Sequence, residues 1–244
     1  MRMTTTNVLT DSWYQEIPGS WLLDMERSEV ANILKKSYGD HLMQIGGTHD
    51  LQHSADSPIL HRVQLVTEPS SDIYHPQIHA NLRELPILPD SLNVVLLIHV
   101  FEFAEYPVRL LEEVYQSLAP GGQLIILGFN PWGYWGLLKM FSRKKECPWN
   151  GKFWSRAHIK QWLRGYDYSI DVNKTLCFRS PRGKSRSRRT TALTETLGQL
   201  CFPTLGGVYL ITATKQVYEP LKQRQFWWKK RAVVRRVVEP TTRM

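Results

Sequence analysis

The feature that most restricts the fold is the segment Asn93–Val100, which is rich in β-branched residues and leucines and has only these from Val94 to Ile98. A strand that is apolar at successive positions is buried on both faces, as central strands of parallel sheets are. A helical pattern follows over Pro107–Leu118 and ends at the breakers Ala119–Gly122, and Gln123–Gly128 reads as a second apolar strand. This order predicts parallel β-α units joined by right-handed crossovers.

The same alternation of strands and helices extends in both directions. We expect strands at His41–Ile45 and Val63–Val66 upstream, and downstream a short helix at Leu137–Phe141, a helix at Ser155–Gly165 and strands at Tyr168–Phe178 and Val208–Ala213. Between the last two strands we expect a Ser/Arg-rich loop at Arg179–Arg189 and a helix across Thr190–Leu200. The pattern predicts three parts, namely a helical N-terminal leader at 1–39, an α/β domain at 40–215 and a basic tail at 216–244.

Charge is distributed unevenly along the chain. Residues 179–244 hold 15 Lys/Arg and 3 Glu, which gives +12, whereas residues 1–178 hold 16 basic and 19 acidic residues, which gives −3. Such asymmetry suggests a polyanionic partner for the tail, either an anionic membrane surface or RNA, and a solvated segment without a specific partner is the alternative.

Cysteine content and the N-terminal residues bear on the cellular compartment. The three cysteines have spacings that fit neither a disulfide framework nor a zinc knuckle, so we expect them to be reduced packing residues and expect no metal site. The first residues lead into no apolar segment of a secretory signal, and no apolar run is long enough to span a membrane. A cytoplasmic protein is the expectation.

Two segments in the correct order carry a family resemblance. Leu85–Asn93, LPILPDSLN, and Leu111–Ile126, LEEVYQSLAPGGQLII, resemble two signatures of class I S-adenosylmethionine-dependent methyltransferases of the type 11 kind. Within this superfamily the chain resembles the bacterial YafS-type proteins. The resemblance implies a Rossmann-like α/β fold with a mostly parallel seven-stranded sheet, helices on both faces and an antiparallel final strand. It also implies S-adenosylmethionine as cofactor and methyl transfer to an unidentified acceptor, with a small molecule as the expected class.

The glycine motif of that family is altered in this chain. Gly46 falls on a motif glycine and is followed by Gly47, while Thr48 and Asp50 stand at the other two glycine positions. In the family these glycines let the backbone approach the cofactor. Gln44 replaces the acid that meets the cofactor ammonium group, so a charge-assisted bond becomes a weaker one.

Three further residues match cofactor-binding positions of the family. Glu68, after the second strand, stands where an acid binds the ribose hydroxyls. Asn81 stands near the expected adenine position, with an Asx turn as its alternative role, and Leu82 is the expected apolar neighbour of the ring.

His99 and Glu102 follow the expected central strand, in the segment that lines the cofactor and faces the substrate in the family. His99 is the candidate general base and cofactor contact, and a buried structural histidine is its alternative. Glu102 is expected at a helix N-terminus.

An aromatic loop follows the strand at Gln123–Gly128. Its residues Trp132, Tyr134 and Trp135 form either the wall of an apolar substrate pocket or a packed loop. Two functions therefore stay open, an active methyltransferase and a catalytically degenerate binding protein that uses its basic loop and tail.

Overall fold

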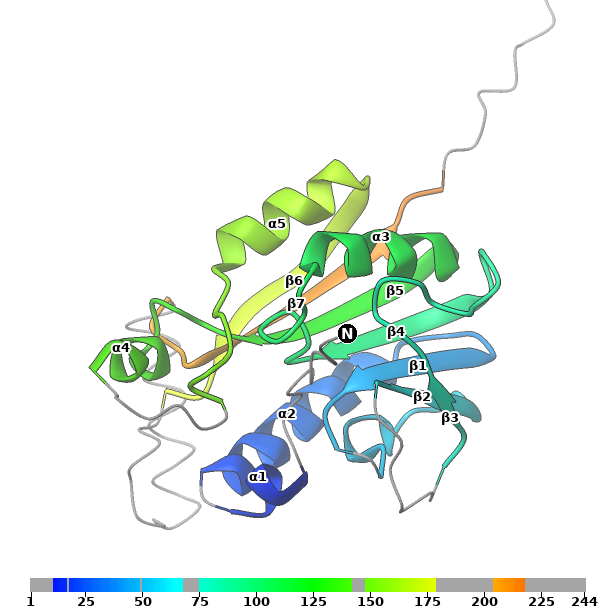
Figure 1. Cartoon of the computed structure of the whole chain (residues 1–244). Helices are drawn as coiled ribbons and strands as arrows, with labels where there is room; N and C mark the ends of the chain where they lie inside the picture. Colours follow the sequence, from blue (N-terminus) through cyan, green and yellow to red (C-terminus); the bar gives the residue numbers. More distant parts are fainter. Residues whose placement is uncertain are drawn as a thin grey trace, which may run out of the picture.

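The computed structural model describes residues 11–16, 18–48, 50–67, 75–141, 148–178 and 204–217. Their strands form one seven-stranded sheet in the order β3-β2-β1-β4-β5-β7-β6 (Figure 1). The strands are β1 His41–Gly46, β2 His61–Val66, β3 Gln77–His79, β4 Leu92–Ile98, β5 Leu118–Phe129, β6 Tyr168–Leu176 and β7 Val208–Lys215.

Strand directions confirm the expected Rossmann-like fold. β1 lies parallel to β2 and β4, β2 is parallel to β3, and β4 is parallel to β5. The final strand β7 lies antiparallel between β5 and β6. The apolar run that includes β4 is therefore a central parallel strand, as its composition predicts.

Helices cover both faces of the sheet (Figure 1). On one face, α3 Pro107–Ser117 and α5 Arg156–Gly165 pack Leu111, Val114 and Leu163 onto the sheet. On the other face, α1 Asp11–Gln15 and α2 Gly19–Leu34 belong to a second core that also includes Trp135 of α4 Tyr134–Phe141. Alternate residues of a strand belong to one core or the other, because successive side chains point to opposite faces of the sheet.

The leader helix α2 is part of this packing. Leu22, Val30 and Leu34 of α2 are buried against Leu42 of β1 and Leu96 of β4. The link between β1 and β2 contains the short 3-10 helix η1, Gln52–Ser54, and α2 packs against η1. An N-terminal segment thus lies beside the turn that follows β1.

The breakers Ala119–Gly122 end α3 as expected but lie within β5. The pairing of β4 with β5 shifts register between Leu92 and Val94, so these residues form an irregularity in the strand. The structure also has β3, a short edge strand that the hydrophobic pattern does not predict.

Several sequence-based expectations fall outside the described residues. These are Glu68, the loop Arg179–Arg189, the helix Thr190–Leu200 and the tail beyond Val217. Within the described ranges, no helix has the length and apolar character needed to cross a membrane.

Candidate functional site

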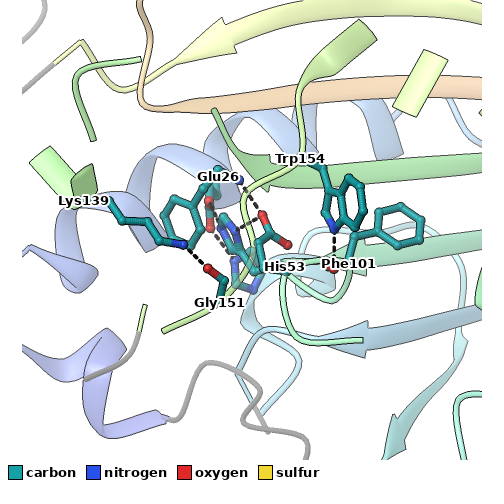
Figure 2. A network of polar contacts seen from close by, with 9 residues as sticks. Glu26, His53, Phe101, Lys139, Gly151 and Trp154 are labelled. Carbon is teal, nitrogen blue, oxygen red and sulfur yellow. Dashed lines mark hydrogen bonds and ion pairs between the residues drawn. The ribbon is translucent and has the colours of Figure 1, made fainter. Parts of the chain in front are cut away.

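Five of the residues singled out from the sequence lie at or near the carboxyl ends of β1 and β4, namely Gln44, Gly46, Gly47, His99 and Glu102. In open α/β sheets, ligands bind at this edge, where the turns leave the strands. The turn Gly46–Thr48 leaves β1, the segment His99–Glu102 leaves β4, and Phe129 ends β5. Glu26 of α2 and His53 of η1 reach the same place from outside the sheet (Figure 2).

The turn after β1 is built on two glycines with left-handed backbone, Gly46 at φ 77° and Gly47 at φ 75°. A Cβ on Gly46 would lie 2.3 Å from the carbonyl oxygen of Ile98, its partner in β4. A Cβ on Gly47 would lie 3.0 Å from His53 Nδ1. Glycine at both positions lets the turn lie close against β4 and η1.

The side chain of Gln44 in β1 makes hydrogen bonds to the same turn. Its Nε2 donates to the carbonyl oxygens of Gly46 at 3.0 Å and Thr48 at 3.3 Å, and its Oε1 accepts from Ser54 Oγ at 3.2 Å. Since both amide atoms are engaged and the side chain is buried, Gln44 organises the turn. Its contact with the cofactor stays a prediction.

A buried ionic network lies beside this turn. One oxygen of Glu26 accepts a hydrogen bond from His99 Nε2 at 2.7 Å, and the other pairs with His53 Nε2 at 3.1 Å. On its other side, His99 Nδ1 is 3.6 Å from Glu102 Oε1, and that oxygen accepts the backbone N–H of Phe129 at 2.5 Å. All four side chains are shielded from solvent. The network joins α2, η1, β4 and β5.

The network fixes the charge of its two central groups. Burial by itself lowers the pKa of His99, but the nearby carboxylates of Glu26 and Glu102 outweigh it and raise that pKa to about 9. Burial raises the pKa of Glu26, yet the charge of His99 and hydrogen bonds from both histidines leave it below its ordinary value. At neutral pH, His99 is an imidazolium paired with the Glu26 carboxylate.

This protonation bears on the role predicted for His99. An imidazolium holds its proton at neutral pH, which disfavours a general-base role for His99 there. His99 also stacks on the ring of Phe129, with centroids 4.1 Å apart, and has a positive φ of 52°. These observations favour the alternative of a buried structural histidine. Glu102, expected at a helix N-terminus, is instead part of the network, because α3 begins only at Pro107.

Asn81 and Leu82 lie after β3. Asn81 Oδ1 accepts the N–H of Arg83 at 3.0 Å, so the Asx turn weighed from the sequence is present. Leu82 is buried in the core on the α3 and α5 face. Contacts of these two residues with an adenine ring stay predictions.

The aromatic loop divides into a packed and an exposed part. Trp135 is 1% exposed and stacks on Phe129 with centroids 5.7 Å apart. Trp132 and Tyr134 are exposed. The packed-loop interpretation therefore holds for Trp135.

Sequence reasoning missed Glu26 and His53. Glu26 lies four residues after Leu22 and four before Val30, on the buried face of α2. A charged residue on the buried face of a helix indicates an internal partner. His53 had no comparable pattern around it. Among the described residues, no group of three or more His, Cys, Asp or Glu is arranged to hold a metal ion.

Two substitutions separate the two reasons for glycine at residue 46, which are the left-handed backbone and the close approach to the Ile98 carbonyl. Gly46→Ala is expected to lower the free energy of unfolding by about 2–5 kcal/mol, because left-handed backbone strain adds to a clash with the Ile98 carbonyl. Gly121→Ala has the same strain at φ 78° but nothing closer than 4.0 Å, so about 1–2 kcal/mol is expected. Chemical denaturation of both variants measures the difference, and equal losses would show that the close approach carries no cost.

Comparisons with known proteins agree with this architecture. Residues 59–126 match the family described as methyltransferase domain. The Escherichia coli K12 protein YafS, itself uncharacterised, is 27% identical over 170 residues, which cover 69% of each chain.

Solved structures with similar folds include a Thermotoga maritima S-adenosylmethionine-dependent methyltransferase, described as a possible histamine N-methyltransferase. It has a TM-score of 0.59 at 16% identity and covers 84% of this chain and 94% of its own. The N-methyltransferase NodS of Bradyrhizobium japonicum WM9, solved with S-adenosylhomocysteine, has a TM-score of 0.54 at 9% identity and covers 83% and 90%.

Proposed function

We propose that this chain is a class I S-adenosylmethionine-dependent methyltransferase, that it binds S-adenosylmethionine at the carboxyl ends of β1, β2 and β4, and that it methylates a small-molecule acceptor. The observation that carries the proposal is a glycine turn after β1, set in a sheet of the order β3-β2-β1-β4-β5-β7-β6. A ligand placed at this edge meets backbone N–H groups and the segment His99–Glu102.

Unpartnered polar atoms around the turn fit a polar ligand. Thr48 Oγ1, Asp50 Oδ1, Gln64 Oε1 and both amide atoms of Gln77 are buried and have no hydrogen-bond partner among the described residues. Gln64 Nε2 donates to the Thr48 carbonyl at 3.1 Å, which places Gln64 beside the turn, and Gln77 pairs with Gln64 across β2 and β3. Since buried polar atoms in proteins are nearly always partnered, this cluster favours a bound group with its own donors and acceptors.

Asp50 is the residue best suited to the amino-acid end of the cofactor. Its Oδ2 accepts from Gln52 Nε2, whereas its buried Oδ1 has no hydrogen-bond partner among the residues that the structure describes. A carboxylate at this point can bind an ammonium group by a charge-assisted hydrogen bond. Asp50 would then supply the negative charge that Gln44 lacks, while Gly46 and Gly47 give the cofactor access to the backbone.

When bound, the sulfonium of S-adenosylmethionine supplies an electrophilic methyl group for in-line displacement. The contribution of the chain is to align and desolvate the acceptor at the ends of β4 and β5. The network of Glu26, His53, His99 and Glu102 serves this role by fixing the two strand ends relative to α2. In this proposal His99, paired with Glu26, acts as a positioning residue.

Titration calorimetry with S-adenosylhomocysteine tests the proposal. Wild type is expected to bind, and Asp50→Asn is expected to weaken binding about 10- to 100-fold, the value of a hydrogen bond to a charged group. Asp56→Asn is the matched control, because Asp56 is half-exposed and pairs with Arg27 at 3.5 Å. An equal loss in both variants would remove Asp50 from the site.

The second candidate function is a methyltransferase-fold binding protein that has lost its cofactor. The observation that favours it is that a neutral Gln44 stands at the usual acidic position, with its Nε2 bonded to the turn and its Oε1 bonded to Ser54 of η1. In that case the basic loop and tail would carry binding to a polyanion. Absence of heat on titrating wild type with millimolar S-adenosylhomocysteine would select this function.

A further inference from the structure

The outer surface of α4 and the turn before it is apolar. Trp132 is 71% exposed and Met140 is 77% exposed, and Tyr134, Leu137 and Leu205 are also exposed. Tyr134, Leu137 and Met140 recur at three-residue spacing and share one face of the helix. The backbone N–H of Tyr134 donates to the Leu205 carbonyl at 3.2 Å, which places Leu205 beside them. We call these five residues the α4 patch.

The single cation of α4 is directed inward. Lys139 Nζ donates to the Gly151 carbonyl (Figure 2). It also lies 4.1 Å from the centroid of the Phe153 ring. Trp135 is buried on the same inner side. The outer surface of α4 is therefore apolar, because its one charged group points to the inner side. α4 lies at one end of the sheet, apart from α3 and α5 (Figure 1).

Charge in the surrounding sequence is opposite to that of the rest of the domain. Residues 132–156 contain six Lys/Arg and one Glu, so their net charge is 6 − 1 = +5. The remainder of residues 1–178 holds 10 basic and 18 acidic residues, which gives 10 − 18 = −8. A negatively charged partner attracts the basic segment and repels the acidic remainder of the domain. It therefore orients the protein with the apolar surface of α4 toward itself.

We propose that the α4 patch is a docking surface for an anionic membrane. Trp132 and Tyr134 are suited to the headgroup level, where amphipathic rings accumulate, and Leu137 and Met140 are suited to the acyl boundary below it. Apart from Lys139, which is directed inward, the basic residues of 132–156 add attraction to anionic lipid. The inference is independent of the proposed catalytic function.

The composition of the patch favours lipid over nucleic acid. Single-stranded nucleic acid is bound by aromatic side chains in a positively charged groove. Here the aliphatic Leu137, Met140 and Leu205 form most of the patch and the cation of the helix is turned away. Leucine and methionine side chains have a favourable free energy of transfer from water into an apolar phase.

Co-sedimentation of the full chain with vesicles tests the inference. Binding to phosphatidylcholine vesicles with 40% phosphatidylglycerol is compared with binding to pure phosphatidylcholine at low and physiological salt. Wild type is expected to prefer the anionic vesicles, and the double variant Trp132→Ser, Met140→Ser is expected to bind them at least tenfold more weakly. The control is Leu60→Ser, Leu88→Ser, which alters two side chains that are 94% and 77% exposed on other segments.

The outcomes separate the patch from the basic tail, which all variants retain. Retained vesicle binding by the patch variant, or an equal loss in the control, would overturn the inference. Failure of the wild type to bind anionic vesicles would also overturn it. The same holds if the patch variant loses binding to single-stranded RNA, measured by mobility shift, as strongly as it loses vesicle binding. Quenching by brominated lipid is expected in wild type and reduced in Trp132→Phe, and equal quenching in both would also overturn it.

Discussion

Replacing Glu26 by glutamine is expected to lower the free energy of unfolding by about 3–5 kcal/mol. The substitution keeps the shape of the side chain but leaves the buried imidazolium of His99 without the carboxylate that lies 2.7 Å from its Nε2. Breaking a buried ion pair by removing one partner costs this much because the remaining charge is uncompensated. Chemical denaturation at neutral pH measures the loss.

Glu29→Gln is the matched control on the same helix. Glu29 pairs with Lys174, and both side chains are partly exposed to solvent. Exposed ion pairs contribute about 0–1 kcal/mol, so the control is expected to lose no more than that. Equal losses in the two variants would mean that burial of the Glu26 network has no energetic role.

The pH profile gives an independent readout of the same pair. His99 has an ordinary pKa of 6.5 and a pKa of about 9 in the folded protein, so between these values the folded state binds more protons than the unfolded state. Stability from His99 is complete below pH 6.5 and is lost as pH rises to about 9, by about 3 kcal/mol. This decline is expected in wild type and should flatten in Glu26→Gln, and an unchanged slope would show that another group titrates.

Trp135→Ala is expected to cost about 3–5 kcal/mol of unfolding free energy. The side chain is buried in the second core, stacks on Phe129 and lies edge-on to Trp13 with centroids 6.4 Å apart. Truncation removes this apolar contact and leaves a cavity that the surrounding rings cannot fill. A thermal or denaturant transition records the loss.

Trp132→Ala in the same loop is the control. Because Trp132 is largely exposed, its removal is expected to change stability by less than about 0.5 kcal/mol. A large loss in this variant would place Trp132 in the folded core and would contradict its assignment to the α4 patch.

Local pattern predicted the elements where one physical demand dominates. The apolar run at Asn93–Val100 had to be buried on both faces, and it forms β4 at the centre of the sheet. The amphipathic period over Pro107–Leu118 had to form a helix with one buried face, and α3 ends one residue earlier, at Ser117. Serine at residue 155 caps α5 as predicted, accepting the N–H of His158 at 3.3 Å.

Contacts between distant segments decided the site. The sequence placed Gln44, Gly46 and His99 at strand ends, but it could not show that Glu26, 73 residues before His99, closes a buried ion pair with it. Such a pair depends on how α2 lies across the sheet, and its geometry also sets the protonation of His99. Local pattern likewise offered Trp132 and Trp135 as equivalent members of one loop, and only the packing of α4 against Phe129 buried one and exposed the other.

The sequence by itself therefore determined the order of the strands and helices apart from β3, the glycine turn after β1 and the family resemblance, because each depends on residues close together in the chain. Only the tertiary structure decided which polar residues pair and what protonation state His99 has. It also decided which aromatic faces meet solvent, because these properties depend on desolvation and on distances between residues far apart in sequence.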